Sequence, residues 1–218
     1  MKSLYLLVVL SAMAAIVFKL NSTMTLFFVF KPLTTLLIIA ALVQFGCRDN
    51  KPLYGAILAG LCACLLGDVF LLDDAYFVFG LASFLIGHLL FALAFMSLGG
   101  FKSYWWLLVV LGGIGVVLYA YLLPELGALW WPVLIYITVI VLMAWQGVNL
   151  FLWRKSATTV CIAVAVILFM ISDSFIAINK FTHPFEASIL VVLSTYWLSI
   201  GLLSYSVVVF NAESKSVT

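Results

Sequence analysis

Eight long apolar stretches follow one another along the 218 residues of this chain, and only short polar connections separate them. Each stretch has roughly the 17–25 residues that a helix needs to cross a hydrocarbon core about 30 Å thick. Only 8% of the residues are charged, whereas a soluble domain has about 25%. We therefore predict an all-α fold, a polytopic membrane bundle of eight transmembrane helices in one domain that covers residues 1–218. The predicted helices lie at about 3–20, 24–45, 53–72, 76–97, 104–122, 129–151, 157–179 and 187–210.

The first stretch also has features of a cleaved signal peptide. Lys2 precedes the apolar run, and small residues between Ser11 and Ala15 offer a cleavage site. The run continues through Phe18, beyond that site, which favours a retained helix.

The basic residues predict the orientation of the bundle. With a cytoplasmic N-terminus, seven of them face the cytoplasm, and Lys19, Lys31 and Lys180 lie toward the other side. The positive-inside rule thus predicts that both termini are cytoplasmic. We expect a multi-pass protein of the cell membrane, which would be the inner membrane if the source is bacterial. The seven basic residues predicted to face the cytoplasm are Lys2, Arg48, Lys51, Lys102, Arg154, Lys155 and Lys215.

The sequence has no basic patch with interleaved aromatic residues that would indicate a nucleic-acid partner.

Two aspartates, Asp68 and Asp173, interrupt the apolar runs of a chain with only eight acidic residues. An ionisable side chain near the centre of a membrane helix costs about 2.5–3.5 kcal/mol on insertion scales, so it usually faces a partner or a polar cavity. At a rise of 1.5 Å per residue, Asp68 lies about 6 Å and Asp173 about 9 Å from the outer helix ends. Lys31 lies at a depth of about 10 Å and His88 near 18 Å. We expect a pocket that opens on the non-cytoplasmic side, with Asp73 and Asp74 at its mouth.

The sequences around the two aspartates echo one another. Gly67-Asp68-Val69-Phe70 corresponds to Ser172-Asp173-Ser174-Phe175, and each of the preceding stretches has a proline near its outer start. A parallel duplication of four helices would place both aspartates about an axis along the membrane normal.

Each of these residues also has a purely structural interpretation. The aspartates could be packing anchors, Lys31 could extend to the membrane interface, and His88 could bond a neighbouring helix. A mixed metal site of Asp68, Asp173 and His88 stays open, although the four cysteines lack zinc-site spacing. We predict neither a metal nor another cofactor.

Several short motifs, taken in their order, resemble the lysoplasmalogenase (YhhN-type) family of membrane proteins. The resemblance extends from about residue 30 to residue 205. The motifs are Lys31-Pro32, Gly67-Asp68-Val69-Phe70-Leu71-Leu72, Phe79-Gly80-Leu81, Gly87-His88, Tyr136, Met143-Ala144-Trp145, Ser172-Asp173-Ser174, Asn179-Lys180-Phe181 and Tyr196.

The resemblance implies hydrolysis of the vinyl ether bond of lysoplasmalogens. These lysophospholipids would enter the protein from the bilayer, whose other lipids surround the helices. The products are a fatty aldehyde and a glycerophospho-ethanolamine or glycerophospho-choline. Vinyl ethers are cleaved by protonation of the alkene carbon that is not bonded to oxygen, and water then captures the resulting oxocarbenium ion. The reaction needs one protonated acid and one anion, and two carboxyl groups in different surroundings can supply both.

On this interpretation Asp173 is the general acid, and Asp68 stabilises the cation and activates water; the reverse assignment stays open. Lys31 would bind phosphate or keep one aspartate ionised, and His88 would orient groups or relay protons. Further residues are expected to line the substrate site, namely Asp73, Tyr136, Ser172, Asn179 and Tyr196.

Two other classes of function also fit a polar pocket in lipid. A proton-coupled transporter would use the same Asp, Lys and His residues, and a non-catalytic lipid-binding protein would need only the pocket. The sequence indicates neither the preferred headgroup nor the oligomeric state.

Overall fold

The computed structural model describes residues 2–46, 48–182 and 187–215, and all regular structure within these ranges is helical. Eight of the helices are long and apolar enough to cross a membrane. The elements are α1 (Lys2–Leu20), α2 (Met24–Phe45), α3 (Lys51–Phe70), η1 (Asp74–Tyr76), α4 (Phe77–Gly99), α5 (Trp105–Leu122), η2 (Leu123–Glu125), η3 (Gly127–Leu129), α6 (Trp130–Trp153), α7 (Ala157–Phe181) and α8 (Ser188–Lys215).

The predicted all-α membrane bundle is confirmed, and most helix ends lie within about two residues of those expected from hydropathy. The exception is α8, which continues to Lys215 instead of ending at 210. Hydropathy detects only the apolar part of a helix, and the last turns of α8 are polar.

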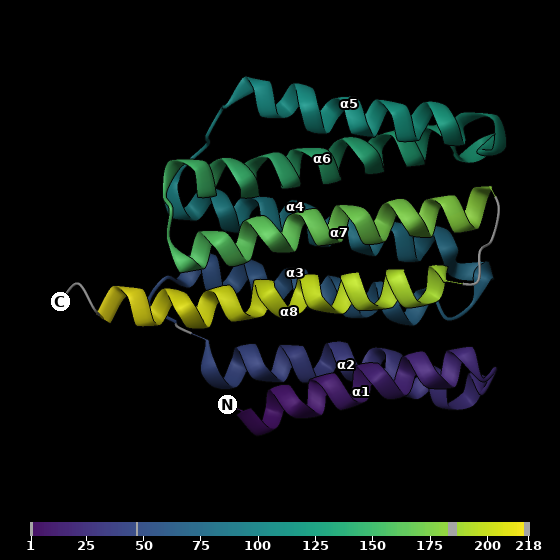
Figure 1. The fold of residues 1–218 in the computed structure, drawn as a ribbon, viewed down its shortest axis with the longest axis horizontal. Coiled ribbons are helices and arrows are strands. Elements are labelled where there is room, and N and C mark those ends of the chain that lie inside the picture. The colour runs from purple at the N-terminus through teal and green to yellow at the C-terminus, as the bar shows by residue number, and fades with distance from the viewer. Residues whose placement is uncertain (1, 47, 183–186, 216–218) are drawn as a thin grey trace.

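The bundle has a central group of four helices flanked by two pairs (Figure 1). The most extensive helix pairs are α3 with α4 and α7 with α8, and these four helices form the centre. The pair α1 and α2 lies on one side, and the pair α5 and α6 on the other. The start of α1 and the end of α8 lie at the same end of the bundle.

A half turn about an axis parallel to the helices would exchange the two halves of the chain in Figure 1. It would place α1 on α5, α2 on α6, α3 on α7 and α4 on α8, without reversing their directions. This arrangement is the one that the proposed parallel duplication requires.

Close packing of α3 on α4 fixes the position of Asp68. A Cβ atom at Gly60 would lie 2.4 Å from Phe91, and one at Gly67 would lie 2.6 Å from Phe84. Glycine at both positions lets the aromatic rings of α4 approach the backbone of α3, as small residues do in membrane helix pairs.

The outer surface of the flanking helices suits lipid. On α5, the side chains of Val109, Val116 and Val117 are 74%, 68% and 71% exposed. Apolar side chains on this surface are expected where a helix faces hydrocarbon rather than water.

Candidate active site

Asp68 lies in the last turn of α3 and is almost fully buried, with 1% of its surface exposed. Its Oδ2 atom accepts hydrogen bonds from Thr35 Oγ1 at 2.5 Å and from Tyr196 OH at 2.8 Å. Lys31 Nζ lies 3.9 Å from Oδ1. Three donor groups thus surround the carboxyl group of Asp68. An ionised carboxylate can only accept hydrogen bonds, so these surroundings suit the ionised form of Asp68.

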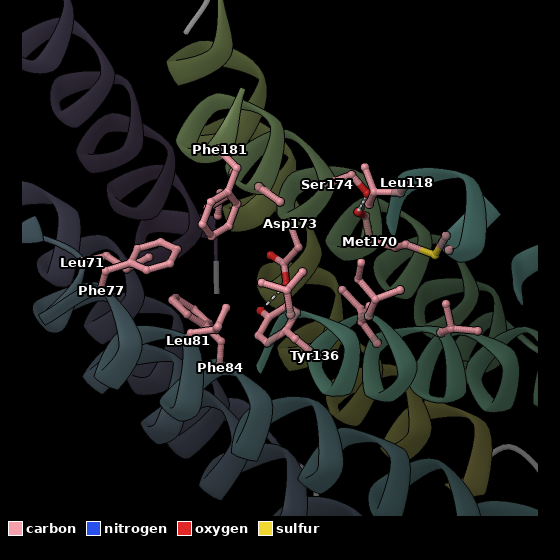
Figure 2. Close-up of a pocket in the computed structure, with 17 residues that line it drawn as sticks. Leu71, Phe77, Leu81, Phe84, Leu118, Tyr136, Met170, Asp173, Ser174 and Phe181 are labelled. Carbon is pink, nitrogen blue, oxygen red and sulfur yellow. Dashed lines mark hydrogen bonds between the residues drawn. The ribbon is translucent and has the colours of Figure 1, made fainter. Parts of the chain in front are cut away.

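Asp173, on α7, has different partners. Tyr136 OH donates a short hydrogen bond to Asp173 Oδ2, as Figure 2 shows. His88 Nε2 lies 3.5 Å from the same oxygen. Among the described residues, no lysine or arginine lies within ion-pair distance of Asp173, and its Oδ1 atom has no hydrogen-bond partner. Asp173 can therefore carry a proton on Oδ1 while Oδ2 accepts from Tyr136.

His88 lies behind Asp173 in an aromatic setting. Its ring is fully buried and makes edge contacts with Phe169, at 4.6 Å between ring centres, and with Tyr136, at 5.3 Å. The Phe169 ring also contacts Tyr196, at 5.7 Å. Neither ring nitrogen of His88 has a hydrogen-bond partner among the described residues, which leaves the contact with Asp173 as its nearest polar interaction.

The partners of the two aspartates come from helices that correspond between the two halves of the chain. Asp68 on α3 is contacted from α2 and α8, and Asp173 on α7 is contacted from α6 and α4. These helices correspond under the half turn seen in Figure 1. The two halves differ in one chemical respect: Lys31 provides a cation on the side of Asp68, and the corresponding position before the proline of α6 is Trp131.

A cavity that we call the polar chamber opens beside the two carboxyl groups, at the end of the bundle opposite the chain termini. It contains about 990 Å³ of space, including its open mouth. The lining residues are Lys19, Phe27, Lys31, Asp68, Leu71, Asp74, Phe77, Phe84, Asp173, Ile176, Asn179, Lys180, Ser188, Ile189, Val192, Leu193 and Tyr196.

A second cavity, the apolar chamber, extends from Asp173 between α4, α5, α6 and α7 (Figure 2). It contains about 670 Å³ of space, including the part that is open to the exterior. Asp173 and four apolar residues line both chambers, so the two meet at this carboxyl group. The lining residues are Leu71, Phe77, Leu81, Phe84, Gly115, Leu118, Val133, Tyr136, Ile137, Ile140, Val141, Met170, Asp173, Ser174, Ile176, Ala177 and Phe181.

The apolar chamber adjoins a groove on the lipid-facing surface between α5 and α7. The groove is lined by Ser174 of α7 and by five residues of α5, namely Gly113, Ile114, Val117, Leu118 and Tyr121. Leu118 and Ser174 line both the groove and the apolar chamber. These two side chains therefore mark the place where the chamber comes closest to surrounding lipid.

The residues predicted from sequence fall into three groups. Lys31, Asn179 and Tyr196 line the polar chamber, and Tyr136 lines the apolar chamber. His88 contacts Asp173 without lining either chamber.

Ser172 and Asp73 line neither chamber. Ser172 is fully buried, and its Oγ donates a 3.1 Å hydrogen bond to the Val192 carbonyl, which joins α7 to α8. Asp73 is exposed and accepts a hydrogen bond from Ala75 N at the start of η1. Its neighbour Asp74 lines the polar chamber instead.

Three polar residues of the site were not predicted from the sequence as site residues: Thr35, Lys19 and Lys180. A threonine in a membrane helix most often bonds its own backbone, so the hydrogen bond from Thr35 to Asp68 had no clear signal. Lys19 and Lys180 stand at helix ends, where lysine is common. Their shared orientation toward the outer side was one indication, and Lys180 also belongs to the motif Asn179-Lys180-Phe181.

Metal-ligand chemistry finds no support in the arrangement of donors. The residues that the structure describes contain no group of three or more His, Cys, Asp or Glu side chains placed to hold a metal ion. The mixed site of Asp68, Asp173 and His88 is thus not formed. His183 and Glu186, which the sequence places on the last outer loop, and Cys47 lie outside the described residues.

The model of the YhhN family matches residues 26–207, which include both aspartates and all their partners. The chain belongs to the YhhN family. It is a multi-pass membrane protein, as its eight apolar helices indicate.

The proteins to which this chain is similar include both named enzymes and uncharacterised proteins. The chain is 35% identical to lysoplasmalogenase TMEM86A of Bos taurus over 161 residues, which are 70% of this chain and 65% of the bovine protein. It is 34% identical to the Homo sapiens protein of that name over 70% of this chain and 65% of the human one. It thus spans less than two thirds of either mammalian relative. No solved structure matches the chain.

A bacterial relative is covered more fully. The chain is 30% identical to the uncharacterized membrane protein YhhN of Escherichia coli O157:H7, over 78% of this chain and 81% of that protein.

Proposed function

We propose that this protein is a membrane hydrolase that cleaves the vinyl ether bond of lysoplasmalogens. The observation that carries the proposal is that two chemically different carboxyl groups line one polar chamber, which an apolar chamber joins at Asp173. Asp68 is surrounded by donors, and Asp173 bonds a tyrosine hydroxyl in a mainly apolar surrounding. The names of the mammalian relatives, lysoplasmalogenases, support the same reaction.

The two chambers suit an amphipathic substrate with one hydrocarbon chain. The chain would lie in the apolar chamber, which is lined almost wholly by apolar side chains. The glycerol and headgroup would lie in the polar chamber, which is lined by three lysines and three aspartates. A vinyl ether joins the chain to the glycerol, so it would sit at the junction, beside Asp173.

Asp173 is the general acid in this proposal. A vinyl ether reacts when the alkene carbon that is not bonded to oxygen takes a proton, which creates an oxocarbenium ion at the carbon bonded to oxygen. Tyr136 occupies Asp173 Oδ2, so Oδ1 is the oxygen that holds the proton to be transferred. The positioned acid then becomes a carboxylate beside the developing cation, which favours the transition state.

Asp68 is the base that activates water. Lys31, Thr35 and Tyr196 hold it as a carboxylate. It takes a proton from the water that attacks the oxocarbenium ion, and a hemiacetal forms. Asp68 then returns that proton to the departing glycerol oxygen, and Asp173 takes the hydroxyl proton of the hemiacetal. The products are an aldehyde and a free glycerol hydroxyl, and both carboxyl groups regain their starting states.

The test is a substrate panel given to purified protein in detergent. We expect aldehyde from a 1-alkenyl lysophospholipid and none from the matched 1-alkyl and 1-acyl lipids, with or without a chelator. Asp68→Asn and Asp173→Asn should each abolish aldehyde release while the protein stays folded. Glu125→Gln, at an exposed position outside both chambers, is the matched control.

Near-normal turnover by both asparagine variants would refute the carboxyl mechanism. Tight binding of the alkenyl lipid without aldehyde would refute hydrolysis and favour a lipid-binding protein instead.

The proposal extends to the side of the membrane on which the polar chamber opens. Seven basic residues lie on the chain segments at the opposite end of the bundle, so the positive-inside rule assigns the mouth to the non-cytoplasmic side. In a cysteine-free background, a single cysteine at Glu125 should react with an impermeant maleimide added outside intact cells. A single cysteine at Lys155 should not, and the opposite result would reverse the orientation.

A further inference from the structure

Two lysines in the wall of the polar chamber have no role in the proposed chemistry. Lys19 is in the last turn of α1, and Lys180 is in the last turn of α7. Both line the polar chamber together with Lys31. The two lysines are far apart in the sequence and reach the chamber from different helices.

The charges around the mouth are arranged unevenly. Lys180 Nζ lies 2.8 Å from Asp74 Oδ1, and the charge of Lys19 also acts on Asp74. Among the described residues, no carboxylate lies within ion-pair distance of Lys19. Lys31, in contrast, is buried and paired with Asp68. The mouth therefore presents two cations and one anion that are separate from the pair deeper in the chamber.

Both outer lysines lie beside an aromatic ring. Lys19 Nζ is 4.9 Å from the centre of the Phe27 ring, and Lys180 Nζ is 4.9 Å from that of Phe77. Phe27 and Phe77 also line the polar chamber. Such contacts hold an ammonium group near the wall and limit its access to bulk water.

We propose that Lys19 and Lys180 bind the phosphate of the lysophospholipid headgroup, and that Asp74 faces its ammonium group. This inference rests on the proposed function and assigns the headgroup site to the mouth. One anion and one cation of a zwitterionic headgroup would then meet two lysines and one aspartate. Lys31 is left to hold Asp68 as a carboxylate rather than to bind phosphate.

A structural role would explain the two lysines differently. Lysine in the last turn of a helix interacts favourably with the negative end of the helix dipole, and Lys180 could serve only to pair with Asp74. In that case, replacing the lysines would change the folded protein in the same way for every substrate. A phosphate site predicts an effect only on substrates that carry phosphate.

The experiment compares Lys19→Gln, Lys180→Gln and the double variant with Lys155→Gln, an exposed lysine at the other end of the bundle. The substrates are a 1-alkenyl lysophosphatidylethanolamine and the phosphate-free 1-alkenylglycerol. Each single variant should raise KM for the phospholipid about tenfold at unchanged kcat, because a charge-assisted hydrogen bond to phosphate is lost in both ground state and transition state. Turnover of the alkenylglycerol should be the same in all four proteins. Equal effects on both substrates, or none on either, would overturn the proposal.

Two further measurements separate this site from the reaction and from simple anion binding. The dissociation constant of an uncleavable 1-alkyl lysophosphatidylethanolamine should rise in the double variant, even if the protein cleaves no lipid at all; an unchanged constant overturns the headgroup site. Inorganic phosphate should compete only weakly with this lipid. Competition by phosphate as strong as that of the unlabelled lipid would assign the lysines to the free ion instead.

Discussion

Tyr136 donates a hydrogen bond to Asp173 Oδ2 from the wall of the apolar chamber, and it is the only hydroxyl among the described residues that bonds this carboxyl group. Asp68, in contrast, accepts from two hydroxyls, those of Thr35 and Tyr196. Tyr136→Phe should therefore reduce kcat about 10²-fold, and Tyr196→Phe much less, because Thr35 still supports Asp68. Steady-state kinetics with a 1-alkenyl lysophospholipid measure both. A larger loss in Tyr196→Phe would reverse the ranking and the roles assigned to the two carboxyl groups.

Removing Lys31 should affect both stability and activity. Lys31→Met leaves the carboxylate of Asp68 buried without its cation, and breaking such a pair typically costs about 3–5 kcal/mol. The double variant Lys31→Met/Asp68→Asn should be more stable than Lys31→Met alone, although inactive, because no uncompensated charge remains. Thermal unfolding in detergent compares them. A double variant as unstable as the single one would show that the pair does not hold Asp68 as a carboxylate.

The surface groove between α5 and α7 predicts the route by which the lipid chain reaches the apolar chamber. Leu118 lines both the groove and the chamber. Leu118→Trp should raise KM for long-chain substrates and affect a short-chain analogue less, because the larger ring narrows the passage. Val116→Trp, on the exposed face of the same helix, is the control. If both variants behave as the unchanged protein does, the chain reaches the site by another path.

Close packing of α3 on α4 gives a prediction about stability alone. A Cβ atom at Gly60 would lie 2.4 Å from the buried ring of Phe91, so Gly60→Ala should destabilise the protein by about 1–3 kcal/mol through overpacking. Gly55, on the same helix, has open space at its Cβ position. Gly55→Ala should leave the melting temperature unchanged or slightly higher. Equal melting temperatures for the two variants would contradict the packing of this helix pair.

The fold could be predicted from the sequence because membrane helices obey a simple physical rule. A segment with every backbone group bonded internally must be apolar over the full thickness of the bilayer, and hydropathy detects such segments directly. The number of helices and most of their ends follow from this rule. The packing of α3 on α4 does not, because it depends on which faces of the helices meet.

The site could be predicted only in part, for a related reason. Asp68 and Asp173 were recognisable because a carboxyl group in hydrocarbon needs a partner, and the structure provides Lys31 and Tyr136 among those expected. Ser172 has the right position in sequence but points toward α8. Thr35 belongs to the site because it donates a hydrogen bond to Asp68, although nothing in its sequence context distinguishes it from other helix threonines. Side-chain direction, rather than depth in the membrane, decides these cases.

Hydrolysis in D₂O tests whether Asp173 transfers a proton to carbon. The released aldehyde should have one deuterium on the carbon next to the carbonyl group, as measured by mass spectrometry after rapid reduction to the alcohol. Unlabelled aldehyde incubated with the protein controls for exchange. An aldehyde released without deuterium at that carbon would contradict protonation of the alkene and, with it, the role assigned to Asp173.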